Sequence, residues 1–318
     1  MTGNELVALL EKNAMPFHLI GSVTDGVIAA LSCEGRLFTV MRGEVISRVA
    51  VDALVRRNQK GPYIPAGGDA LWPAPEGTNL GYQYATGVWR IPPGLACTIY
   101  AVTRKSENCA IIETDVDLIN ADGLGVPTHF RRECAIQRIE TGLRIRTVES
   151  IVYIGTHSHS RQECLLAPWS LSQFDVSQGC HVVCPAASPK SLWDLYEPSD
   201  SLRSEHDGLW RFATEGTTRY QIGLGPDVSW IELHLPDRGL CIRRHAELLP
   251  TGLGYTDIAD APPNVKPETR DTRYSIFNGN TGFMEIEAAG GCPAIIEQGS
   301  ELRMVVTTEF RRVSSITA

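Results

Sequence analysis

The sequence lacks long hydrophobic runs. Its longest apolar stretch near the start, Val27 to Leu31, ends at Ser32, well short of the ~20 apolar residues that a membrane-spanning helix needs. The first residues, Met1 to Glu5, contain neither a basic segment nor an apolar core, so they do not resemble a secretory signal. These absences predict a cytoplasmic chain without a membrane partner.

The sequence also lacks the charge pattern of a nucleic-acid-binding protein. The formal net charge is −8. The short basic pairs Arg131-Arg132, Arg243-Arg244 and Arg311-Arg312 each stand beside acidic or apolar residues. Electrostatic attraction to a phosphate backbone or to anionic lipid is therefore disfavoured. We expect no nucleic acid among its partners.

Metal-binding and cofactor-binding motifs are missing as well. Of the nine cysteines only Cys180 and Cys184 lie close together, and no second pair stands at zinc-ribbon spacing. An odd number of cysteines without a secretory signal favours free thiols. Phosphate-binding glycine loops, a nucleophile-elbow serine and paired metal-binding histidines on a helix are not found. We expect neither a cofactor nor a metal.

What the sequence does contain is alternation of apolar and polar residues. The 318 residues are 43% hydrophobic and 21% charged, as in ordinary globular proteins. A short helix is predicted within residues 1–16, with Asn4 as its cap and Leu6, Leu9 and Leu10 on one face. Strands are expected at residues 26–31, 35–41, 44–51, 95–103, 109–119, 132–139, 143–154, 163–174, 179–184, 219–224, 229–235, 239–244, 273–277, 282–288 and 301–310. So many short alternating segments predict an all-β sandwich, with residues 1–318 forming one domain.

Several polar segments are assigned to turns, loops or solvated faces. Residues 140–142 are predicted to close a hairpin, and residues 157–160 to form an exposed turn. In the latter, His157 and His159 could share one strand face and bind a metal, but the turn is the favoured interpretation. Residues 185–208 are expected to form a loop with a helical turn. The acidic residues at 113, 115 and 117 could form a glycosidase carboxylate pair, although a solvated strand face is the commoner explanation.

The most unusual segment is the run from Ala66 to Gly77, which contains three glycines and two prolines. We expect a stiffened loop that displays Trp72 and Glu76. Aromatic rings stack on the C–H faces of sugars, and charged side chains hydrogen-bond to sugar hydroxyls. Tyr84 and Arg90 extend this aromatic and polar character. The alternative is that Trp72 only covers an edge of the core.

The same segment carries a resemblance to a known family. Residues 67–76, Gly-Gly-Asp-Ala-Leu-Trp-Pro-Ala-Pro-Glu, resemble the Gly-Gly…Trp-Pro-x-Pro segment of an uncharacterised branch of galactose-mutarotase-like proteins, in the aldose 1-epimerase superfamily. Further similar segments follow in the expected order at residues 128–139, 165–171, 282–287 and 298–301. The resemblance implies a β-supersandwich whose concave face binds a small-molecule carbohydrate.

The resemblance also implies candidate site residues. In epimerases of that superfamily, a glutamate on the C-terminal strand is the base on the anomeric hydroxyl. Here Glu285 and Glu287 both qualify, and two residues apart on a strand they share a face. Glu287 is slightly favoured, because it precedes an Ala-Ala-Gly-Gly segment that would let substrate approach. Arg132 corresponds to the family's arginine-bearing strand. The alternative is that both glutamates lie on a solvated face.

The sequence departs from the family pattern at the acid. Where the epimerases place Asn-His-x-Tyr-Phe, this chain has Ala-Pro-Trp-Ser-Leu at residues 167–171. Trp169 can contact a sugar, but its indole N–H cannot protonate a ring oxygen. His129, Arg132 or Tyr84 are possible substitutes. Three functions stay open: an epimerase, a sugar-binding protein without turnover, and a lyase or hydrolase on the same scaffold.

Overall fold

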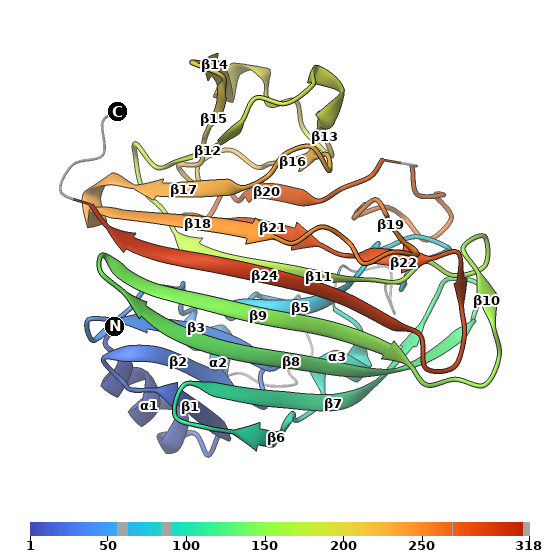
Figure 1. The fold of residues 1–318 in the computed structure, drawn as a ribbon, viewed down its shortest axis with the longest axis horizontal. Helices are drawn as coiled ribbons and strands as arrows, with labels where there is room; N and C mark the ends of the chain where they lie inside the picture. The colour runs from blue at the N-terminus through green and yellow to red at the C-terminus, as the bar shows by residue number, and fades with distance from the viewer. Residues whose placement is uncertain (56–62, 84–88, 90, 269, 314–318) are drawn as a thin grey trace.

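The computed structural model describes residues 1–55, 63–83, 89, 91–268 and 270–313. Its architecture is two large antiparallel sheets, here called sheet I and sheet II. Figure 1 shows the long strands of sheet II crossing the molecule, with the N-terminal helix, in blue, at one end. The predicted all-β fold is confirmed. No helix among the described residues is long and apolar enough to cross a membrane.

Sheet I is formed by strands from both halves of the chain, in the order β1-β2-β3-β5-β11-β21-β20-β16-β13, with β4 paired to β3. Its strands are β1 (Phe17–Gly21), β2 (Asp25–Ala30), β3 (Arg36–Met41), β4 (Glu44–Val45), β5 (Asp69–Ala74), β11 (Ala167–Asp175), β13 (Leu192–Asp194), β16 (Tyr220–Leu224), β20 (Tyr274–Asn278) and β21 (Phe283–Ala289). Strands distant in sequence therefore become neighbours at its centre.

Sheet II has the order β14-β15-β12-β17-β18-β24-β9-β8-β7-β6. Its strands are β6 (Ala101–Lys105), β7 (Cys109–Ile119), β8 (Gly125–Ile139), β9 (Gly142–Tyr153), β12 (His181–Pro185), β14 (Arg203–His206), β15 (Leu209–Ala213), β17 (Ile231–Leu235), β18 (Leu240–Ala246) and β24 (Glu301–Arg312). Two small sheets pair β10 (His159–Ser160) with β23 (Ile295–Ile296), and β19 (Leu253–Tyr255) with β22 (Gly291–Pro293). The helices are α1 (Gly3–Lys12), α2 (Val51–Val55), α3 (Pro93–Ala96), η1 (Pro189–Ser191), η2 (Asp200–Leu202) and η3 (Pro236–Arg238).

The main core lies between the two sheets. Strand alternation sends Phe130 and Ile151 of sheet II, and Ile222 and Ile286 of sheet I, into one buried cluster. Burying side chains of this size stabilises the fold by about 1.5–3 kcal/mol each. Each sheet therefore has an inner face against its partner and an outer face that points away from it.

Charged side chains are also buried between the sheets. Arg132 of β8 and Arg244 of β18 both reach Asp69 of β5. Glu149 of β9 accepts two further hydrogen bonds from Arg132, at 2.9 and 2.8 Å. Buried charges are tolerated only when they are paired and hydrogen-bonded, and this network meets that condition with two arginines and two carboxylates.

Helix α1 covers one end of the outer face of sheet I. Its cap is Thr2, whose hydroxyl accepts from the amide of Glu5 while the Glu5 side chain accepts from the amide of Thr2. The prediction of Asn4 as the cap was therefore wrong. Leu6 and Leu10 pack into a second cluster with side chains of β2 and β3.

Several segments differ from the sequence prediction, and one of them is residues 44–51, where β4 ends at Val45 and helix α2 begins at Val51. Residues 95–103 were expected to form a strand, but α3 occupies Pro93–Ala96 because prolines fit the first turn of a helix. The Trp72 segment was expected to be a loop, yet Asp69–Ala74 is strand β5 at the centre of sheet I. Residues 185–208 contain β13 and β14 besides two 3₁₀ turns. The predicted hairpin at residues 140–142 is confirmed between β8 and β9.

Candidate functional site

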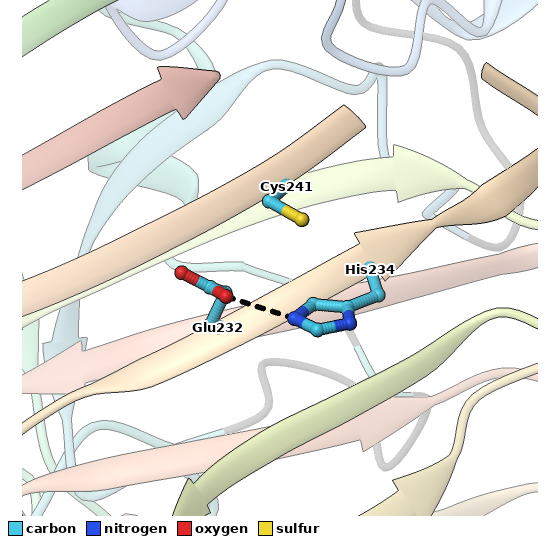
Figure 2. A group of neighbouring side chains, drawn as sticks. All are labelled: Glu232, His234 and Cys241. Atoms are coloured by element: carbon cyan, nitrogen blue, oxygen red, sulfur yellow. Dashed lines mark hydrogen bonds and ion pairs between the residues drawn. The ribbon is translucent and has the colours of Figure 1, made fainter. Parts of the chain in front are cut away.

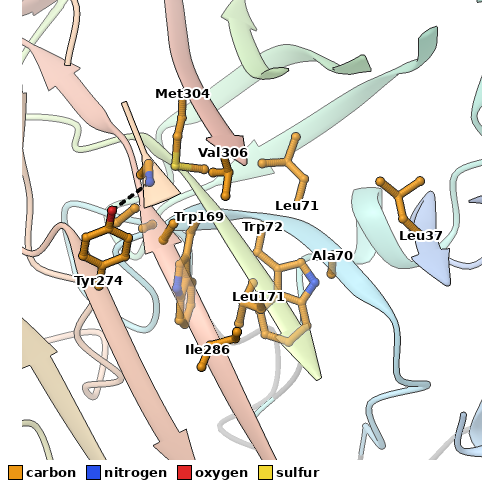
Figure 3. Packing of buried hydrophobic residues seen from close by; sticks show 14 of the residues in the cluster. Leu37, Ala70, Leu71, Trp72, Trp169, Leu171, Tyr274, Ile286, Met304 and Val306 are labelled. Carbon is orange, nitrogen blue, oxygen red and sulfur yellow. Dashed lines mark hydrogen bonds between the residues drawn. The ribbon is translucent and has the colours of Figure 1, made fainter. Parts of the chain in front are cut away.

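The outer face of sheet I gathers the aromatic and acidic residues singled out in the sequence. Trp72 of β5 stands opposite Trp169 of β11, and Glu287 of β21 stands opposite Leu171 of β11. Figure 3 shows the two indoles lying together, on the side away from Leu71. Their ring centroids are 5.9 Å apart in an edge-to-face arrangement. The sheet thus brings residues about a hundred or more positions apart in the sequence onto one surface.

Glu285 and Glu287 project from β21 onto this face. Both are buried, with 6% and 1% of their surfaces exposed, so the alternative of a solvated face was wrong. Glu287 Oε2 accepts from Trp169 Nε1 and from Gln221 Nε2, each at 3.1 Å. Glu285 Oε1 accepts from Gln173 Nε2 at 2.6 Å. The two carboxyl groups are therefore fixed by amide and indole donors.

Burial of these carboxyl groups changes their acidity. Burial raises the pKa of Glu287 well above its ordinary range, and the neighbouring charge of Glu285 raises it further. The pKa of Glu285 is also raised by burial, while hydrogen bonds from Glu287 and Gln173 act in the opposite direction. Two close carboxyl groups in a dry site cannot both ionise easily. The pair is therefore arranged to hold a proton on Glu287 next to an acceptor on Glu285.

The two glycines that follow this strand do not open a path to Glu287. A Cβ atom on Gly290 would meet Pro168 at 2.5 Å, and one on Gly291 would meet Leu249 at 2.6 Å. The space beside each glycine is thus already filled by a neighbouring side chain. Both glutamates lie on the same face, and the preference for Glu287 over Glu285 stays a prediction.

A second polar group lies beside Trp72. Its indole Nε1 donates to Glu34 Oε2 at 3.0 Å, and the same oxygen accepts from Arg36 Nη2 at 2.8 Å. Tyr63 donates to the other carboxylate oxygen of Glu34 at 2.7 Å. Glu34 has φ +55°, a left-handed conformation that is uncommon for a residue with a side chain. The turn between β2 and β3 thus directs a carboxylate toward Trp72.

Aromatic rings close this part of the face. The ring of Tyr63 lies 5.9 Å from that of Trp72, and the ring of Trp89 lies 5.8 Å from it. Trp72 is consequently only 3% exposed. The sequence predicted that Trp72 is displayed on a loop, and this was wrong because β5 is a central strand. The ring of Trp72 is therefore covered in this structure.

Glu76 is a further buried carboxyl group and lies near the half-buried Asp260. It accepts from the Tyr82 hydroxyl at 2.7 Å, and residue 76 forms a backbone bridge with Asp260. Burial raises the pKa of Glu76 well above its usual range, and the charges of Asp260 and Glu285 raise it further. Asp260 in turn accepts from Tyr196 at 2.8 Å. The charge of Glu285 therefore also raises the pKa of Glu76.

Two predicted site residues lie elsewhere in the fold. Arg132 is fully buried between the sheets and donates to Asp69 and Glu149, so its predicted place in the groove was wrong. His129 lies on the outer face of sheet II, where Nδ1 contacts Asp115 Oδ1 at 2.7 Å. Alternation on β8 sends these two side chains to opposite faces. His129 therefore cannot replace the missing acid beside Glu287.

The remaining candidates from the sequence include two aspartates of β7 and two histidines in or next to β10. Tyr84 and Arg90 lie outside the described residues. Asp115 and Asp117 are exposed on β7, as expected of a solvated strand face. His157 is exposed, but His159 is buried in β10, where its Nε2 lies 3.1 Å from the Tyr153 hydroxyl. The exposed turn predicted for residues 157–160 is thus correct only in part.

Sequence reasoning missed several residues of this face. They are the polar side chains that contact the carboxyl groups or Trp72, namely Glu34, Arg36, Gln173, Gln221, Ser275 and Tyr63. The available signal was weak: Gln221 is a single amide in the apolar run Tyr-Gln-Ile-Gly-Leu of β16. A buried amide in such a run requires a partner, but the sequence does not say which one.

Comparison with known proteins supports the fold. A galactose mutarotase-like protein from Lactobacillus casei superimposes with a TM-score of 0.57 at 10% identity, covering 93% of this chain and 100% of that one. A galactose mutarotase related enzyme from Lactobacillus acidophilus gives 0.53 at 11% identity, covering 95% and 100%. A GalM/aldose epimerase homologue from C. elegans gives 0.50 at 9% identity, covering 94% and 100%.

The galactose-mutarotase-like fold expected from the sequence is thereby confirmed. No protein-family profile matches the sequence. No curated protein matches it either. At such low identities the likeness concerns the fold alone, and function has to be argued from the site.

Proposed function

We propose that this protein binds a small-molecule carbohydrate on the outer face of sheet I. The observation that carries the proposal is the buried Glu285–Glu287 pair, held by amide donors beside two tryptophans. Carboxyl and amide groups hydrogen-bond to sugar hydroxyls, and indole rings pack on sugar C–H groups. The mutarotase-like fold supports the proposal, because the compared proteins share this architecture.

The same pair provides a means of anomeric epimerisation. Opening a sugar ring requires removal of a proton from the anomeric hydroxyl and delivery of a proton to the ring oxygen. Glu285 acts as the base, and protonated Glu287 acts as the acid. This assignment reverses the one favoured from the sequence, because burial and the charge of Glu285 both favour a proton on Glu287. It also supplies the acid that no histidine provides at position 169.

Binding without turnover is the second candidate. One observation favours it: Trp169 and Gln221 both donate to Glu287 Oε2. These donors restrict the movement of the carboxyl group that would have to give up its proton. In this case the acidic pair only recognises hydroxyl groups, and anomers bind without being exchanged.

Saturation-transfer NMR between anomers, across a panel of aldoses and sugar acids, distinguishes these candidates. The wild type is expected to accelerate exchange for at least one sugar, and Glu285→Gln and Glu287→Gln should each slow it by a factor of about 100 or more. Glu297→Gln is the matched control, because it makes the same change in an exposed turn. Exchange that is equal in all four proteins would exclude the epimerase assignment.

Binding itself is tested by thermal shift against the same sugars. A ligand of the folded protein raises Tm by mass action. Gln221→Leu removes a donor of the face, so the shift should shrink in this variant and persist in Glu297→Gln. A shift that survives Gln221→Leu, Glu285→Gln and Glu287→Gln would place the sugar on another surface.

A further inference from the structure

A second cluster of reactive side chains lies on the outer face of sheet II, on neighbouring strands β17 and β18. It consists of Glu232, His234 and Cys241, and Figure 2 shows the three side chains directed toward one another. A carboxylate oxygen, an imidazole nitrogen and the sulfur all lie within 4.8 Å of one another. His234 and Cys241 are direct cross-strand partners, so the sheet itself fixes their proximity.

Glu232 orients the histidine. Its Oε1 lies 2.8 Å from His234 Nε2. Its other oxygen, Oε2, accepts from Arg243 Nε at 2.7 Å and also from Arg311. The carboxylate is thus fully engaged, because one oxygen holds the imidazole and the other holds two guanidinium groups.

The electrostatics of the cluster are unfavourable for a metal cation. Glu232 is the single carboxylate of the group and already faces the guanidinium groups of Arg243 and Arg311. A divalent ion here would repel both guanidinium groups at short range. The same arrangement favours an anion next to His234, and the group placed there is the thiol of Cys241.

Burial and the neighbouring side chains act in opposite directions on the acidity of His234. Burial alone would lower its pKa, but Cys241 and Glu232 outweigh burial and raise the pKa to about 9. The imidazole is therefore protonated at neutral pH. The flanking strands contribute His181 of β12 and Arg211 of β15, which lie 3.3 Å apart, and neither is anionic. His181 stacks edge-on with His234 at 4.7 Å.

We propose that Cys241 is a modification site: its sulfur, held beside His234 and near the guanidinium groups of Arg243 and Arg311, reacts with small electrophiles, hydrogen peroxide among them. Thiolates, not thiols, are the nucleophiles, and cationic surroundings stabilise them. In the peroxide reaction the sulfur attacks one oxygen, an S–O bond forms and the O–O bond breaks. The sulfur is oxidised to sulfenic acid, and the departing hydroxide takes the proton of His234 to form water.

Cys241 is buried, but less completely than Cys164 and Cys184. Cys241 is 6% exposed, whereas Cys184 is 0% exposed. Burial raises the pKa of Cys184 to about 12, and raises that of Cys164 to about 12 as well. These two thiols are internal controls for a cysteine that is buried and has no cationic partner to stabilise its thiolate.

Limited alkylation by iodoacetamide, followed by peptide mass spectrometry of the native protein, tests the proposal. At about pH 7, Cys241 should be labelled about tenfold faster than Cys184 and Cys164. His234→Gln can still donate to Glu232 but carries no positive charge. It should slow labelling of Cys241 about tenfold without changing the rate at the exposed Cys97. Peroxide followed by dimedone should trap sulfenic acid at Cys241 in the wild type and much less in His234→Gln.

Three results would overturn the proposal. The first is labelling of Cys241 that is no faster than that of Cys184. The second is an unchanged rate at Cys241 in His234→Gln, provided that urea unfolding shows the variant to be folded. The third is stoichiometric protection of Cys241 by Zn²⁺ alone, which would assign the cluster to a metal instead.

Discussion

Arg244 of sheet II lies 2.8 Å from Asp69 of sheet I, so a charged hydrogen bond crosses the interior of the protein. Asp69 also accepts from Arg132, and a single carboxylate thereby joins two strands of one sheet to a strand of the other. Removing one partner of a buried ion pair leaves the other charge uncompensated. Asp69 is therefore a structural residue, although it stands in the segment whose sequence suggested ligand binding.

Substituting Asp69 tests this role. Asp69→Asn should lower the free energy of unfolding by about 3–5 kcal/mol, because buried Arg244 loses its carboxylate partner and Arg132 keeps only Glu149. Urea denaturation measures the change. Asp207→Asn is the control, since the side chain of Asp207 is 85% exposed, and it should stay within about 0.5 kcal/mol. Equal effects of the two substitutions would contradict the structural role of Asp69.

The buried glutamate pair predicts a dependence of stability on pH. Glu287 holds its proton more tightly in the folded protein than in the unfolded chain, where its pKa is near the ordinary 4.5. The folded state therefore binds more protons above that pH, and the free energy of unfolding falls as the pH rises through the folded pKa. One proton accounts for at most about 1.4 kcal/mol per pH unit.

Glu287→Gln should remove this contribution. Its stability relative to the wild type is expected to improve as the pH rises from about 5 to about 8, because glutamine never ionises. Urea unfolding across that range measures the difference, and Glu297→Gln should show no such trend. A difference that stays constant with pH would show that Glu287 titrates normally.

The pKa values of two neighbouring histidines, His181 and His234, are expected to shift in opposite directions from the ordinary value. Burial lowers the pKa of His181 to about 4, with the nearby charges of His234 and Arg211 adding to the effect. The pKa of His234 is raised to about 9. Imidazole NMR shifts followed against pH should resolve both. Midpoints near 6.5 for both residues would contradict the arrangement.

The signs of their stability contributions are also opposite. His181 stays neutral in the folded protein, so its contribution is lost as the pH falls from about 6.5 through about 4. The contribution of His234 is present below about 6.5 and is lost as the pH rises through about 9. The contributions of the two histidines should therefore decline at opposite ends of this range.

Truncation of Trp72 should act mainly on stability. Its ring packs against Trp169, Tyr63 and Trp89, so Trp72→Ala is expected to lower the free energy of unfolding by about 3–5 kcal/mol. Trp230→Ala should have a smaller effect, because Trp230 is half-buried and stacks on Arg243. Urea denaturation compares the two, and a smaller loss at position 72 would contradict the burial described here.

Most of the fold could be predicted from the sequence, because alternation is a local signal. The residues of β7, β9, β21 and β24 alternate clearly, and each was placed within a few positions. Strand β5 was missed because proline is unusual in a central strand. There Pro73 stands opposite Pro168 of β11, and the Pro168 carbonyl accepts from the amide of Gly290 instead, so the missing proline amides remove no hydrogen bond between β5 and β11 at this pair. Such compensation between distant segments cannot be seen in one segment alone.

The site was predicted less completely, because the side of a sheet to which a side chain points depends on how strands distant in sequence pair and pack. The expectation that Glu285 and Glu287 share a face needed only the period of a strand and was correct. Whether Arg132 points inward or outward depends on which sheet lies against β8. The sequence does not contain that information in any local pattern. The hydrogen bond from Trp72 to Glu34 joins residues 38 positions apart, one in β5 and the other in the turn between β2 and β3.

The hydrogen bond from Arg244 to the carbonyl of Ile286, at 2.6 Å, has a consequence for the acidic pair. Ile286 is the residue between Glu285 and Glu287, so the strand that carries both acids is anchored at its midpoint from the opposite sheet. Arg244 is also three residues from Cys241 on β18. The relative position of the two carboxyl groups is thus maintained by a residue of the opposite sheet. Substitution of Arg244 in sheet II can therefore alter the position and acidity of Glu285 and Glu287 without changing any residue of the face that carries them.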